Sequence, residues 1–117
     1  MSKRTPNLLL EDILDAANKI LEYTQEFSFE DFSEDNKSID AVCRNFEIIG
    51  EAAARVRTES KEKFPSIPWL QIVGMRNRLV HGYDAVDLDV LWDTIVDDLP
   101  PLITGLEKIL HSKKNEN

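Results

Sequence analysis

The sequence predicts an all-α protein, an up-and-down bundle of four to five helices. Apolar residues recur with helical spacing through most of the 117 residues, and only four glycines and five prolines interrupt them. We find no strand-like alternation, no internal repeat and no low-complexity tract. Because the length is close to that of an average domain, we expect one domain over residues 1–117, with its core within about 8–110.

The first predicted helix has an apolar stripe whose members are three or four residues apart. The stripe consists of Leu9, Ile13, Ala16, Ile20, Tyr23 and Phe27. Asn7, which follows Pro6, is a candidate N-cap. The next stretch, 28–37, is acidic and broken, and we expect Phe29 and Phe32 to anchor it on the core.

A second helix follows, and one part of it consists of unusually small residues. Its apolar stripe is Ile39, Val42, Phe46, Ile49, Ala53 and Val56. Asn36 or Ser38 is a candidate N-cap. Gly50 and residues 52–54 would let another helix approach closely, and a glycine at mid-helix costs about 1 kcal/mol relative to alanine. We therefore expect tight packing at this point.

Residues 59–68 form a connector, after which a third helix is predicted from Trp69 to about Val80. Pro68 suits its first turn, because the N–H that proline lacks would be unpaired there. Apolar residues lie on two stripes of this helix, which predicts a place in the middle of the bundle. Gly82 is a natural terminator.

The last predicted helix runs from near Val86 to about Leu110. Pro100 and Pro101 interrupt its apolar pattern, so we expect a kink or a break there. The tail, 112–117, is expected to fray.

Composition excludes several classes of protein. A formal net charge of −8 argues against a protein that coats nucleic acid or an anionic membrane. The single cysteine, Cys43, rules out an intrachain disulfide, and with two histidines it leaves no ordinary structural zinc site. The apolar run near the N-terminus is too short for a secretion signal or a membrane span. We therefore expect a reduced, cytoplasmic chain without metal or cofactor.

The charge is distributed unevenly along the chain. Residues 44–78 contain seven basic and four acidic side chains, whereas both flanking segments are strongly acidic. Solvated helix faces account for part of this pattern, including the alternating series Arg44, Glu47, Glu51 and Arg55. The six aspartates within 84–98 could dock a basic partner, although a solvated helix face is the simpler interpretation.

The segment from Gly74 to Tyr83 holds the densest group of functional side chains. His81 can change its charge near neutral pH, and Arg76 provides a permanent cation that suits phosphate. A proton carrier beside such a cation is what phosphodiester transfer requires. A histidine at a helix end is also commonly a cap or a dipole partner, and His111 is assigned that role near the last helix's C-terminus.

Helical geometry constrains this pair. Arg76 and His81 are five residues apart, so they lie about 140° apart around an ideal helix. Gly74, Asn77, Arg78 and His81 share a face instead. Arg76 and His81 can meet only if the helix ends before His81, or if two chains contribute one residue each across a dimer interface.

The order Arg76, four residues, His81, one residue, Tyr83 resembles the R-x4-H-x-Y motif of HepT-type toxins in the HEPN superfamily. The resemblance extends to 46–53, 86–94 and 98–101, and so covers roughly 8–110. It implies a HEPN-like, all-α homodimer that acts as a metal-independent endoribonuclease.

The resemblance also implies roles for individual residues and a partner. Arg76 would stabilise the phosphate, His81 would be the acid and base, and Tyr83 would be the site of AMPylation by a minimal nucleotidyltransferase antitoxin. Asn77 and Arg78 occupy unspecified positions of the motif, and we interpret them as RNA contacts because they share a face with His81. Glu51 is a weaker candidate for orienting the active-site cation.

Two other functions are compatible with the sequence. The chain could be a non-catalytic helical module that binds and regulates a nucleotidyltransferase, which would suit its acidic surface. It could also bind nucleotides without cleaving RNA. Cleavage that depends on His81 separates the enzyme from both alternatives.

Overall fold

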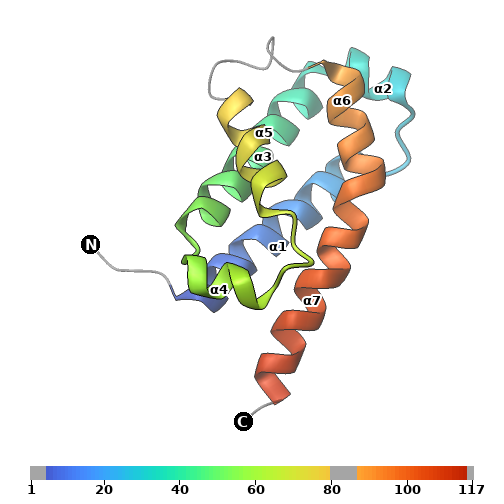
Figure 1. Ribbon diagram of the computed structural model, residues 1–117. Helices are drawn as coiled ribbons and strands as arrows, with labels where there is room; N and C mark the ends of the chain where they lie inside the picture. The colour runs from blue at the N-terminus through green and yellow to red at the C-terminus, as the bar shows by residue number, and fades with distance from the viewer. Residues whose placement is uncertain (1–4, 80–86, 116–117) are drawn as a thin grey trace.

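The structure, a computed structural model, describes residues 5–79 and 87–115, and these ranges are mostly helical with no strand (Figure 1). The helices are α1 (Pro6–Tyr23), α2 (Phe29–Glu34), α3 (Asn36–Arg55), α4 (Thr58–Lys63), α5 (Trp69–Leu79), α6 (Leu88–Asp93), the π-helical turn η2 (Thr94–Asp98) and α7 (Leu99–Asn115). The predicted all-α class is confirmed. Within the described ranges, no helix is long and apolar enough to cross a membrane.

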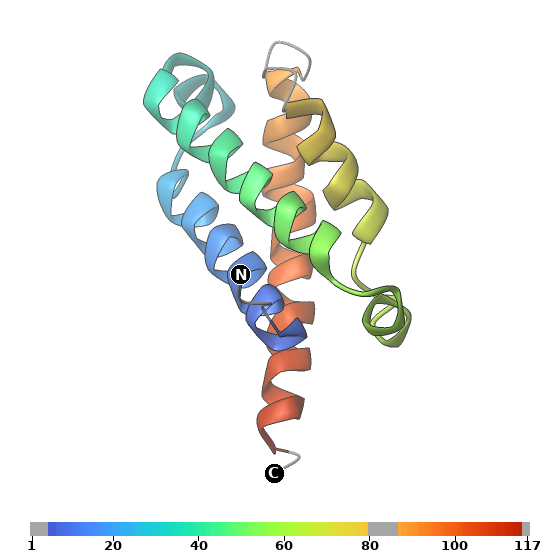
Figure 2. The same cartoon turned by 90° about the vertical axis from the view of Figure 1, so that its left-hand side faces the viewer.

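Four long helical segments form an up-and-down bundle. The chain direction alternates through α1, α3, α5 and the continuous rod formed by α6, η2 and α7, as Figures 1 and 2 show. Helix α3 packs against both α1 and α5, and α1 also packs against α7. The short helices α2 and α4 lie in the two connectors that the sequence left irregular.

Both predicted N-caps are wrong, by one to three residues. Thr5 caps α1, because its hydroxyl accepts a hydrogen bond from the backbone N–H of Leu8 at 3.2 Å, and Asn7 lies inside the helix. Asp35 caps α3 and accepts from both the backbone and the hydroxyl of Ser38. Asp35, one position before Asn36 and three before Ser38, therefore does what we expected of one of those residues.

The core is built from the predicted apolar stripes. Its fully buried side chains include Leu10, Ile13, Ile20, Phe32, Val42, Ile49, Leu91, Leu99 and Leu106. Phe32 anchors α2 as expected, and its ring lies 5.4 Å from that of Trp92 on α6. The first stripe stops short of its prediction, because α1 ends at Tyr23, whose side chain is exposed.

The predicted interruption at Pro100 and Pro101 takes the form of a π-helical turn rather than a break. The backbone N–H of Leu99 bonds to the carbonyl of Thr94, five residues earlier. Prolines cannot donate to the carbonyls four residues before them, and a wider turn accommodates those unpaired carbonyls while the helix continues. The helical rod of α6, η2 and α7 therefore stays intact.

Helix α7 extends to Asn115 and so includes 112–115, while the expected fraying of the tail stays a prediction. Another expectation about the helices is wrong. Helix α5 lies at the edge of the bundle rather than in its middle. Leu79 is its one buried side chain in the described part of the chain, and Leu70 is 87% exposed.

Phe32→Ala should lower the free energy of unfolding by about 3–5 kcal/mol, because it opens a cavity beneath Trp92. Leu70→Ala, at an exposed position on α5, should change it by no more than about 0.5 kcal/mol. Urea unfolding followed by circular dichroism measures both values. Equal effects of the two substitutions would contradict the placement of α2 on the core.

Candidate functional site

Helix α5 carries the part of the predicted site that the structure describes. Arg76, Asn77 and Arg78 occupy its last turn. His81 and Tyr83, together with the predicted terminator Gly82, lie outside the described residues. How His81 meets Arg76 therefore stays a prediction, and the geometry that follows concerns the arginine and its surroundings.

The close helix approach that we predicted at Gly50 is present, and the helix that approaches is α5. A Cβ atom built on Gly50 would lie 2.0 Å from the Cβ of Arg76 and 2.7 Å from its Cγ. It would also lie 3.2 Å from the backbone carbonyl of Ile72. Only glycine fits here, and the contact presses the stem of Arg76 directly against the backbone of α3.

Among the described residues, one nitrogen of the Arg76 guanidinium is hydrogen-bonded and another is buried without a partner. Its Nη1 donates to the Oδ1 of Asn77 at 3.0 Å. Its Nε is buried and, among the described residues, has no hydrogen-bond partner. A buried donor without a partner costs about 1–3 kcal/mol, so an acceptor supplied by a ligand or by another chain would be favoured here.

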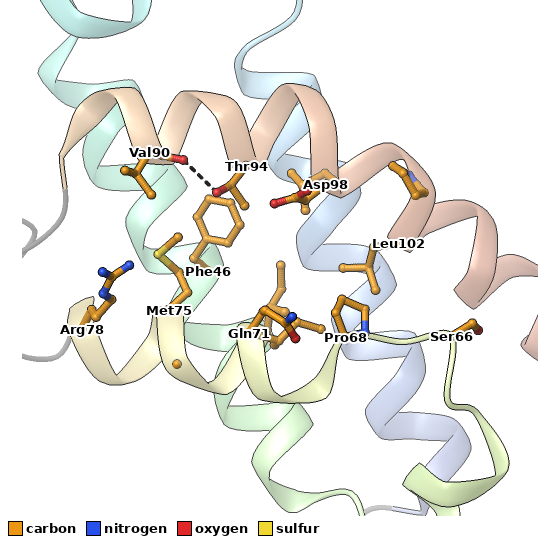
Figure 3. Close-up of a pocket in the computed structure, with 15 residues that line it drawn as sticks. Phe46, Ser66, Pro68, Gln71, Met75, Arg78, Val90, Thr94, Asp98 and Leu102 are labelled. Carbon is orange, nitrogen blue, oxygen red and sulfur yellow. Dashed lines mark hydrogen bonds between the residues drawn. The ribbon is translucent and has the colours of Figure 1, made fainter.

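Arg78 lies on the other side of α5. Two residues correspond to about 200° around a helix, so Arg76 faces α3 while Arg78 faces α6 and η2. Arg78 lines a groove of about 680 Å³ between α5 and the rod of α6, η2 and α7 (Figure 3). Gly74, which was predicted to share a helix face with Arg78, also lines the groove. Asn77, predicted for the same face, is exposed and bonded to Arg76 instead.

The groove is apolar inside and carries a few polar side chains. Its apolar lining includes Phe46, Ile49, Ile72, Met75, Leu99 and Leu102. Its polar lining includes Ser66, Gln71, Arg78, Thr94 and Asp98. The sequence offered one signal for it, the spacing of Gln71, Gly74 and Arg78 on one helix face. Thr94 and Asp98 were missed, because only the fold brings η2 beside α5.

Glu51 follows Gly50 in α3, next to the contact with Arg76. Its carboxylate lies 4.0 Å from the guanidinium of Arg44, which also pairs with Glu47 at 3.5 Å. These are pairs on a partly exposed face, as the spacing of the charges predicted. The role of Glu51 as an orienting residue stays a prediction.

Other chemistries find little support among the described residues. Cys43 is buried, and burial, followed by the nearby carboxylates of Asp40 and Glu47, raises the pKa of its thiol to about 11. The thiol is therefore protonated at neutral pH and a poor nucleophile. Within the described ranges, no group of three or more His, Cys, Asp or Glu side chains could hold a metal ion.

His111 lies far from α5's C-terminal end, in the last turns of α7. It lines a shallow hollow together with the carboxylates of Glu11, Asp15 and Glu107. Its position near a helix C-terminus agrees with the predicted interaction with the helix dipole. The role of His81, five residues after Arg76 in the chain, stays a prediction.

Comparisons with known proteins point to one family. The model of a family described as "Ribonuclease HepT-like" matches residues 13–109. The chain is 44% identical over 107 residues to a Thermococcus cleftensis protein named "Probable ribonuclease HepT", covering 92% of this chain and 97% of that one. It is 39% identical to a Methanocaldococcus jannaschii protein named as a "Putative RNase", covering 92% and 98%. Comparison with solved structures finds no significant match.

Gly50→Ala should lower the free energy of unfolding by about 1–2 kcal/mol, because overpacking against Arg76 outweighs the better helix propensity of alanine. Gly74→Ala is the matched control, since a Cβ atom there has no neighbour within 4 Å. It should raise the free energy of unfolding by up to about 1 kcal/mol. Urea unfolding of both variants tests the contact, and a shift of the same sign in both would contradict it.

Proposed function

The chain belongs to the HepT-like ribonuclease family, and we propose that it is an endoribonuclease that cleaves RNA with Arg76 and His81. The observation that carries this proposal is the buried Nε of Arg76, which has no partner among the described residues. Gly50 and Asn77 hold this cation from two sides. A guanidinium fixed in advance, with a free donor, suits the oxygens of a phosphate in the transition state.

The chemistry follows from the two side chains and the ribose. A base removes the proton of the 2′-hydroxyl, whose oxygen attacks the adjacent phosphorus and forms a new P–O bond. The bond from phosphorus to the 5′-oxygen breaks, and an acid protonates that oxygen. The products are a 2′,3′-cyclic phosphate and a 5′-hydroxyl. His81 is the acid and base in this proposal, and Arg76 stabilises the negative charge that develops on the phosphate.

A homodimer would complete the site. One chain offers one histidine beside Arg76, whereas the reaction benefits from both a base and an acid. A two-fold axis near the end of α5 would bring two copies of Arg76 and His81 to one cleft. It would also bring together two copies of the basic segment 44–78, so that RNA meets a positive groove on a chain whose net charge is −8.

We further propose that this is the toxin of a toxin–antitoxin pair, silenced by AMPylation of Tyr83. The partner would be a minimal nucleotidyltransferase of the MNT type. Tyr83 lies two residues after His81, so an adenylyl group there would place a bulky anion where the RNA phosphate must bind. Steric exclusion and repulsion between like charges would then act together.

The purified chain should cleave single-stranded RNA in the presence of EDTA and leave 2′,3′-cyclic phosphate ends. Arg76→Ala and His81→Ala should each lower the rate by at least about 100-fold, because each removes one half of the chemistry. His111→Ala, which removes the other histidine, should leave the rate unchanged. If wild type cleaves no faster than His81→Ala, the proposed ribonuclease function is wrong, and the two non-catalytic alternatives remain.

Co-expression with a minimal nucleotidyltransferase of the MNT type should raise the intact mass of the chain by a whole number of adenylyl groups. Tyr83→Phe should abolish the increase, because it removes the acceptor hydroxyl. Tyr23→Phe is the control, since it changes the other tyrosine, which is 41% exposed on α1. An undiminished mass increase in Tyr83→Phe would assign the modification to another residue.

A further inference from the structure

Helices α3 and α5 each contain one glycine, and within the described part of the chain a close contact requires glycine at only one of the two positions. Gly50 is required by its contact with Arg76. Gly74, in the middle of α5, would accept a Cβ atom with no neighbour within 4 Å. Glycine weakens a helix interior, and a glycine that no intrachain contact requires is typical of a place where a ligand approaches the backbone. Gly74 lines the groove.

On the face of α5 that borders the groove, the side chains lie in an order that matches the parts of a nucleotide. Gln71, Gly74, Met75 and Arg78 follow one another at helical spacing and all line it. The face therefore offers a cation at one end, a flat apolar stretch in the middle and an amide at the other end. Arg78 and Gln71 are separated by about 10 Å along the helix axis. Arg78 lies at the end from which the chain continues toward His81 (Figure 3).

The opposite wall offers hydrogen-bond acceptors. Thr94 donates its hydroxyl proton to the carbonyl of Val90 at 2.8 Å, so its oxygen can only accept from a ligand. Asp98 offers a carboxylate, which also only accepts. Among the described residues of the lining, Arg78 is the one basic residue and Asp98 the one acidic residue. The groove therefore suits a single phosphate at the Arg78 end and an uncharged ring rich in N–H donors inside.

We propose that this groove binds one nucleotide of the RNA substrate, next to the bond that is cleaved, and that it prefers guanine. The phosphate contacts Arg78, and the base lies against Gly74, Met75 and Phe46. Guanine places an N1–H and an amino group on the same edge, and these donors meet the acceptors of Thr94 and Asp98. Single-stranded RNA exposes this edge for reading.

This inference rests on the proposed ribonuclease function, which supplies the RNA, and it adds a substrate preference to it. It also assigns separate tasks to neighbouring residues. Arg76 faces α3 and acts on the scissile phosphate, whereas Arg78 faces the groove and holds the next one. Asp98 limits the groove to one phosphate, because a second would lie beside its carboxylate.

The test measures binding without cleavage. Fluorescein-labelled hexaribonucleotides of adenosine with A, C, G or U at one internal position are titrated with the full-length His81→Ala chain, and anisotropy is recorded. The hexamer with guanine should bind about tenfold tighter than the one with uracil. Adding Gly74→Leu, which fills the groove, should weaken binding of the guanine hexamer about tenfold and remove the preference.

Two controls separate binding from folding. Gly74→Leu has open space for its side chain, so its melting temperature should not fall. Ala54→Leu adds the same side chain at an exposed position on α3 that does not line the groove, and it should bind all four hexamers as the parent does. Thr94→Val keeps the shape and removes the acceptor, so it should reduce the guanine preference alone.

Equal binding of the four hexamers, or unchanged binding by Gly74→Leu, would overturn the proposal. A third result would also overturn it: Gly74→Leu loses RNA binding, and sedimentation velocity shows that the same substitution converts a dimer into a monomer. The groove would then be an interface between copies of the chain. Failure of the ribonuclease is distinguishable. Guanine-selective binding without cleavage by wild type would retain this site, whereas cleavage with no base preference would remove it.

Discussion

The contact between Gly50 and Arg76 determines how the rest of the site is placed. It brings α5 onto the backbone of α3, so the stem of Arg76 is held between two closely packed helices. With no room for a Cβ atom between them, the first atoms of the Arg76 side chain have little freedom. Asn77 then fixes the far end of the guanidinium. Orienting the cation costs conformational entropy, and much of this entropy is therefore lost during folding rather than when RNA would bind.

The same contact accounts for the groove. Helix α5 leans on α3 and lies at the edge of the bundle, with one face against that helix and the opposite face toward α6 and η2. Side chains on the second face do not fill the space, because Gly74 has none. The apolar stripe that predicted a central helix therefore lines an open groove instead. An edge helix with an apolar second face is typical of a binding surface.

The sequence predicted those features that depend on spacing within one helix. The extent of α5, the core stripes and the close approach at Gly50 all follow from residues three or four apart. Features that join separate helices were not predictable in this way. The edge position of α5 and the lining by Thr94 and Asp98 depend on how the last rod lies, and η2 shifts its register by one residue. The role of His81 stays a prediction for a different reason, because the described residues end two positions before it.

The fold places the basic and the acidic segments of the chain on different helices. The basic segment 44–78 spans α3, α4 and α5, whereas the carboxylates of Asp89, Asp93 and Asp97 are exposed on α6 and η2. Arg78 is the member of this segment's basic residues that lines the groove, so in the proposed function RNA would be attracted to the α5 wall and repelled by the carboxylates of the opposite rod. Attraction confined to a single wall makes affinity modest and salt-dependent, since few phosphates are neutralised. Selectivity must then come from fixed donors and acceptors, because bulk charge on this chain opposes binding of any RNA that does not fit the groove.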